Sequence, residues 1–76
     1  MNQRRRKELE RAKEMIATAS EIVSSTMEEE QEAFENMPEG IQESDRGQKM
    51  EEAIDAMESA IDSMDEAIQH LDAASE

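Results

Sequence analysis

The sequence contains no cysteine, tryptophan or tyrosine, and its one aromatic side chain is Phe34. The absence of cysteine excludes disulfides, thiol nucleophiles and zinc sites of the zinc-finger type. Strand-rich folds depend on aromatic and β-branched residues, whereas the apolar residues here are mostly Ala, Met and Ile, a composition that favours helices. The one proline and both glycines lie within residues 36–47, so nothing interrupts a helix elsewhere.

Long apolar runs are also absent. No run approaches the roughly 20 residues that cross a bilayer, and the start, MNQRRRKELE, lacks the apolar segment of a signal peptide. With 76 residues the chain suits one small domain. We therefore expect a cytoplasmic protein with no membrane partner.

Cations are scarce and unevenly placed. The net charge is -13, and no Lys or Arg follows Lys49. Six of the eight basic residues lie in the first 13 positions, which carry +4, while residues 14–76 carry -17. A surface of this kind repels nucleic acid and anionic membranes, so direct nucleic-acid binding is not expected.

The second half of the chain repeats with a period of seven: MEEAIDA, MESAIDS, MDEAIQH and then LDAASE, from residue 50 onward. The Met, Ile and Ala positions of this heptad fall on three adjacent lines of a helix. Three apolar positions in seven make a stripe that is typical of a helix in a bundle of three or more helices. The oligomer interface predicted on this helix comprises Met50, Ile54, Met57, Ile61, Met64, Ile68 and Leu71.

The first half has helical periodicity too, with apolar residues three and four apart from Leu9 to Val23. Ile16 and Val23 are the residues of this helix that we expect in the oligomer interface. After Val23 the apolar stripe drifts, because Glu30 occupies the next seam position, and the segment SSTMEE offers a capping-box pattern. Since no Gly or Pro interrupts it, we predict one continuous helix.

The break between the helices is NMPEGIQESDRG, residues 36–47. Pro38 disfavours a helical conformation at Met37, and Ser44 or Asp45 is suited to cap the next helix. The predicted fold is all-α: a single domain, residues 1–76, that forms an antiparallel helical hairpin. Its first helix spans about 4–36, its loop about 37–44 and its second helix about 45–74.

Two helices alone have no third layer to cover their apolar faces. A chain this short seldom gains more than about 3–5 kcal/mol from its own core. We therefore expect the hairpins to self-associate into a four-helix bundle or a higher oligomer. The Met-rich face is adaptable enough to receive a helix of another protein instead.

Catalytic groups are almost absent. The single His, His70, lies off the Met/Ile seam and is not part of the Glu-x-x-His pattern of di-iron bundles. The carboxylates of the heptad form a solvated helix face, and no loop has the alternating ligands and central glycine of an EF-hand. We expect no enzymatic activity, no metal site and no cofactor.

Two interpretations of the basic start, RRRKELERAK, stay open. Arginines at a helix N-terminus suit a phosphate group. Alternatively, an antiparallel hairpin lays this start beside the acidic end of the second helix, residues 65–76, and lays Arg46 and Lys49 beside residues 28–35. The anion-binding residues predicted on the first interpretation are Arg4, Arg5, Arg11, Arg46 and Gly47, the glycine allowing close approach of the ligand.

Residues 28–62 carry the motifs EEQEAF-x-N-x-P-E, S-[DE]-R-G and M-x-x-A-I-D. In these motifs the chain resembles small acidic hairpin proteins encoded by phages and mobile elements of Gram-positive bacteria. The resemblance covers the loop and most of the second helix and implies no established activity. Phage proteins of this size often act by binding: some trap nucleotide signals of host immunity, and others are acidic inhibitors or DNA mimics.

The leading hypothesis from the sequence is a self-associating, non-enzymatic binding protein. It would sequester a host immune nucleotide signal, as a phage counter-defence protein in the cytoplasm of the host cell. Two alternatives remain: an acidic DNA mimic or inhibitor that blocks a host nucleic-acid-binding protein, and a structural coiled-coil scaffold without a ligand.

Overall fold

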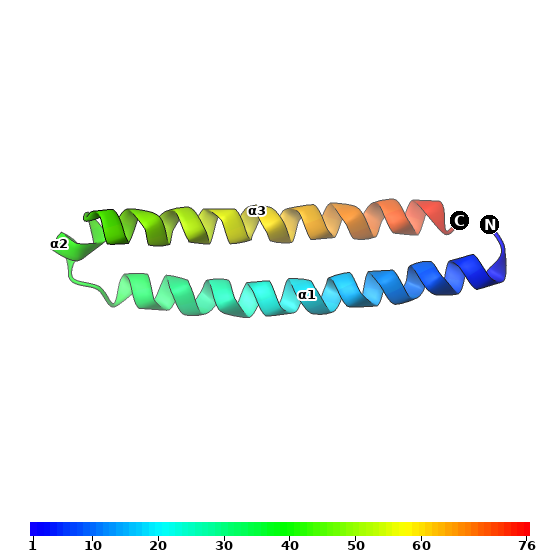
Figure 1. Ribbon diagram of the computed structural model, residues 1–76, viewed down its shortest axis with the longest axis horizontal. Coiled ribbons are helices and arrows are strands. Elements are labelled where there is room, and N and C mark those ends of the chain that lie inside the picture. Colours follow the sequence, from blue (N-terminus) through cyan, green and yellow to red (C-terminus); the bar gives the residue numbers. More distant parts are fainter.

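The computed structural model describes all 76 residues, as two long helices that lie side by side and a short helix between them (Figure 1). Helix α1 spans Gln3–Glu35, α2 spans Glu39–Gln42 and α3 spans Asp45–Ala74. The long helices run in opposite directions, so both termini lie at one end, called the open end, and α2 lies at the other, called the loop end. The predicted all-α hairpin is confirmed. The bounds of the long helices lie within one residue of those predicted, and α2 is an addition to the predicted loop.

Each long helix begins at a side-chain cap. Asn2 Oδ1 accepts a hydrogen bond from the Arg5 N–H (2.8 Å), and Ser44 Oγ accepts one from the Gly47 N–H (3.4 Å). These caps satisfy N–H groups that have no partner within the helix. The predicted continuity of the first helix is confirmed, because Thr26 does not start a new helix there: its hydroxyl donates to the carbonyl of Ile22 (2.8 Å).

The loop end is held by backbone and amide contacts. Gln42 Nε2 donates to the carbonyls of Phe34 (2.9 Å) and Met37 (3.1 Å), which ties α2 to the last turn of α1. Gly47, in the first turn of α3, packs so closely on α2 that a Cβ atom there would overlap the backbone carbonyl of Gln42. Because neither glycine has a positive φ, Gly47 is required for this close approach and not for its backbone conformation.

A heptad seam joins α1 and α3. On α1 the half-buried seam positions recur at spacings of three and four through Val23, Glu30 and Phe34. The apolar pattern of the sequence suggests a shift of the seam after Val23, but the seam does not shift there. Glu30 stays on the seam and half-buried because the backbone follows the heptad geometry whether or not each position is apolar.

The hairpin has no enclosed core. Gly47 is its only buried residue, and no hydrophobic side chain is buried. The accessible surface is 5728 Å², against about 4,700 Å² for a compact monomer of this mass. The radius of gyration is 17.2 Å, against about 11 Å for a compact domain of this length. No helix combines the length and the apolar character needed to span a membrane.

Candidate functional site

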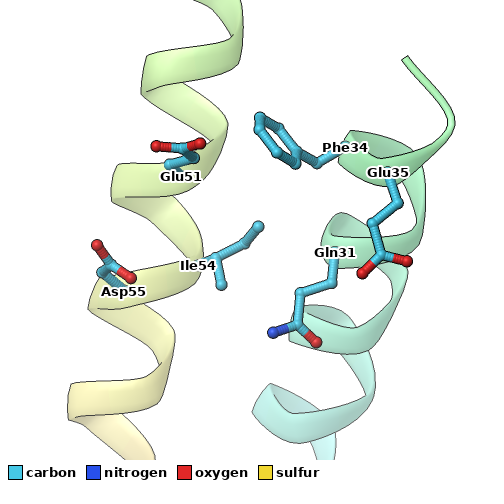
Figure 2. A pocket seen from close by; sticks show the side chains of 6 residues that line it. All are labelled: Gln31, Phe34, Glu35, Glu51, Ile54 and Asp55. Atoms are coloured by element: carbon cyan, nitrogen blue, oxygen red, sulfur yellow. The ribbon is translucent and has the colours of Figure 1, made fainter. Parts of the chain in front are cut away.

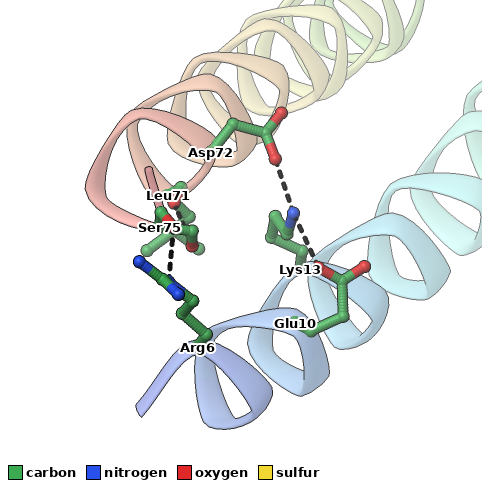
Figure 3. Close-up of polar contacts among 6 residues, drawn as sticks. All are labelled: Arg6, Glu10, Lys13, Leu71, Asp72 and Ser75. Atoms are coloured by element: carbon green, nitrogen blue, oxygen red, sulfur yellow. Dashed lines mark hydrogen bonds and ion pairs between the residues drawn. The ribbon is translucent and has the colours of Figure 1, made fainter. Parts of the chain in front are cut away.

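The open end carries the contacts that join the two termini (Figure 3). Lys13 Nζ lies 2.5 Å from Asp72 Oδ1 and 2.8 Å from Glu10 Oε2, and its side chain is only 16% exposed. The hydrogen bond to Asp72, followed by that to Glu10, raises the pKa of Lys13 above its ordinary value, because both carboxylates favour the charged amine. Lys13 therefore stays protonated and anchors the ends of α1 and α3 to each other.

The rest of the basic start is mostly free of acidic partners. Arg6 Nε donates to the backbone carbonyl of Ser75 (3.0 Å), and Arg11 pairs with Glu8 on its own helix (2.9 Å). Arg4, Arg5 and Lys7 form no ion pair.

Fewer ion pairs join the two helices than the charge pattern predicts. Lys13 to Asp72 is the one ion pair that crosses between them. Arg46 and Lys49 make no ion pair with residues 28–35.

The five predicted anion-binding residues do not meet in one hairpin. Arg4, Arg5 and Arg11 belong to the open end, whereas Arg46 and Gly47 belong to the loop end of a molecule that is 58 Å long (Figure 1). The close approach that Gly47 permits is to the backbone of α2, not to a ligand. Sequence spacing does not reveal this role of Gly47, because the position of α2 depends on tertiary contacts.

The nine residues predicted in the oligomer interface lie between the two long helices of the same chain. All are half-buried and follow the seam between α1 and α3 of the same chain, and α1 and α3 make extensive contact. The structure therefore places the following residues first in the intramolecular seam: Ile16, Val23, Met50, Ile54, Met57, Ile61, Met64, Ile68 and Leu71.

One flank of this seam is acidic. Near the loop end it holds a shallow groove of about 250 Å³. Phe34 and Ile54 point toward each other between the helices there, with Glu35, Glu51 and Asp55 around them (Figure 2). The line of Glu51 continues at heptad spacing to Asp72, which meets Lys13 at the open end, so this acidic flank follows the whole length of α3.

The opposite flank carries small, uncharged residues at heptad spacing. We call it the neutral flank. Its large side chains are Met15 and Ile22 of α1, each 63% exposed, one heptad apart. Beside the seam its small residues are Ala12, Ala19, Ala53, Ala60, Ala67 and Ala74.

No group of three or more acidic or histidine side chains is placed to hold a metal ion, and His70 is exposed. Comparisons with models of protein families, with curated proteins and with solved structures find no match for this chain. The hairpin presents three surfaces to its surroundings: the basic open end, the acidic flank and the neutral flank.

Proposed function

We propose that this chain is a non-enzymatic, self-associating binding protein whose hairpins pair into a four-helix bundle. The observation that carries the proposal is the absence of any buried hydrophobic side chain in the single hairpin. Its surface exceeds that of a compact monomer by about 1,000 Å², which is similar to the roughly 800 Å² that each partner buries in a standard protein interface. Pairing of two hairpins would remove part of this apolar surface from water, and the hydrophobic effect would then stabilise the pair.

Sedimentation equilibrium tests self-association directly. The monomer has a mass of 8.6 kDa, and we expect twice that mass, or a higher multiple, at micromolar concentration. We also expect the melting temperature to rise with chain concentration, because association stabilises the folded state by mass action. A monomer mass at every concentration, with a constant melting temperature, would contradict the proposal.

The ligand that we propose for the assembly is a phosphate-bearing small molecule at the open end. Arg4, Arg5 and Lys7 have no carboxylate partner there, and unpaired guanidinium groups suit bidentate binding of phosphate. In this proposal the ligand is a nucleotide signal of host immunity, and the protein acts in the cytoplasm of the host cell as a phage counter-defence protein by sequestering it.

Titration calorimetry with cyclic dinucleotides and cyclic ADP-ribose isomers tests the ligand. Stoichiometric binding is expected, and it should be lost in the double variant Arg4→Gln, Arg5→Gln. It should persist in Glu58→Gln, which lies midway along α3 and removes no cation. No heat of binding from any signal nucleotide would refute sequestration, and equal binding by the double variant would refute the assigned residues.

A second candidate function is favoured by the acidic flank. Carboxylates repeated along one side of a rod can occupy the basic groove of a nucleic-acid-binding protein in place of phosphates. This candidate predicts competition with DNA that is lost when Glu51, Glu58 and Asp65 are replaced by Lys, yet persists when Arg4 and Arg5 are replaced by Gln. A scaffold without a ligand would self-associate and show neither activity.

A further inference from the structure

The neutral flank is a continuous surface without charge over its central part. Between Ala12 and Thr26 of α1 its positions carry no charged side chain, and the same holds from Ala53 to Ala74 of α3. Arg11 and Glu14 border it beside Met15. Alanines let two helices approach to the short end of the usual 8–10 Å range. Exposed Met15 and Ile22 add the apolar area that such a contact needs.

The size of this face matches a dimer interface. The hairpin measures 58 × 15 × 12 Å between Cα positions. The rectangle enclosed by its two longer dimensions, charged ends included, is roughly 900 Å², the same order as the roughly 800 Å² that one partner of a stable complex buries. A second copy of the same hairpin has the length needed to cover this face from end to end.

The charge distribution decides the direction of the second copy. The half of the hairpin at the open end, residues 1–21 and 64–76, has six basic and eight acidic side chains and a net charge of -2. The half at the loop end, residues 22–63, has two basic and thirteen acidic side chains and a net charge of -11. Two copies in the same direction set the two -11 halves side by side, whereas reversed copies set each -11 half against a -2 half and lower the repulsion.

From these observations we infer that a second copy docks on the neutral flank with its long axis reversed, so that each open end lies beside the loop end of the other copy. The inference rests on the self-association proposed above and adds its surface and direction. A two-fold axis across the middle of the hairpin then sets α1 against α1 and α3 against α3, which is a closed, isologous contact.

The reversed arrangement has a consequence for the charged ends. The unpaired Arg4, Arg5 and Lys7 come to lie at the end of the bundle that holds the acidic residues 28–35 of the other copy. Arg46 of that copy lies at the same end. The dimer thereby gathers at each end the arginines that a single hairpin keeps apart.

One label per chain measures the direction. The sequence has no cysteine, and a Cβ atom at Gly40, in α2, meets nothing within 4 Å, so Gly40→Cys takes a single spin label without disturbing the loop. Pulsed electron paramagnetic resonance on the dimer should give a separation approaching the 58 Å length of the hairpin. Dipolar broadening of the continuous-wave spectrum, as two labels about 10–15 Å apart produce in copies that run in the same direction, would overturn the inference while leaving self-association intact.

Two matched variants identify the flank. Ala19 lies on the neutral flank and Ala17 faces the acidic flank two residues away, and both are exposed in the hairpin. Ala19→Glu should weaken dimerisation on the order of tenfold or more, because it buries an unpaired charge, whereas Ala17→Glu should change it by no more than about threefold, as expected for an exposed charge. Both should keep the helical circular-dichroism signal.

The opposite ranking of these two variants would place the contact on the acidic flank and overturn the inference. A wild-type chain that stays monomeric would instead refute the proposed self-association itself. The two failures are therefore distinguishable.

Discussion

Replacing Gly47 by alanine should destabilise the hairpin, although the same change stabilises most helices. Alanine at an ordinary helical position is favoured over glycine by about 0.5–1 kcal/mol. At Gly47, however, the new methyl group would overlap the backbone carbonyl of Gln42, so α2 would have to move. Overpacking of this kind costs about 1–3 kcal/mol. We therefore expect a net loss of about 1–2 kcal/mol, a large share of what so small a hairpin possesses.

Gly40→Ala is the matched control, because the same methyl group meets nothing within 4 Å there. Its φ is not positive, so alanine fits the backbone and should stabilise the hairpin by about 0.4–1 kcal/mol through the unfolded state. Urea unfolding followed by circular dichroism, at one fixed chain concentration, measures both variants. A Gly47→Ala midpoint equal to or above that of the wild type would refute the close packing of α2 on α3.

Two further changes probe the seam and the open end. Glu30→Leu should raise the free energy of unfolding by about 1 kcal/mol, because it places an apolar side chain at a half-buried seam position. Glu32→Leu, on the exposed side of α1, is the control and should not raise it. Equal urea midpoints for the two variants would argue against a seam through Glu30. Lys13 has a pKa raised mainly by Asp72, so its contribution to stability is present below its ordinary value of 10.5 and is lost as the pH rises through the raised value. The melting temperature of the wild type should accordingly fall more steeply than that of Lys13→Gln as the pH rises above 10.5, and parallel curves would show that the contact is not formed in solution.

Much of the fold follows from local rules. The heptad from Met50 to Leu71 requires a helix with one apolar stripe. Pro38 prevents α1 from continuing, and Ser44 caps the start of α3. These features act over a few residues, so the sequence predicts them well. Periodicity does not predict the short α2, because this helix is a single turn stabilised by hydrogen bonds from the side-chain amide of Gln42 to the carbonyls of Phe34 and Met37.

The candidate sites were less predictable than the helices. Charge patterning predicts the basic start beside the acidic end of α3, and one ion pair forms there, between Lys13 and Asp72. It also suggested pairs for Arg46 and Lys49 that the structure does not form, because long exposed side chains gain little from an ion pair in water.

The sequence by itself determined the two helices, the turn between them and the unequal charge of the two ends, because each depends on residue type and short spacing. Only the tertiary structure decided that the Met/Ile stripe packs within the chain and that Gly47 allows α2 to pack closely on α3. Those outcomes depend on which side of each helix faces the other. Once the seam is occupied, the flank of alanines, Met15 and Ile22 is the apolar surface left to a partner.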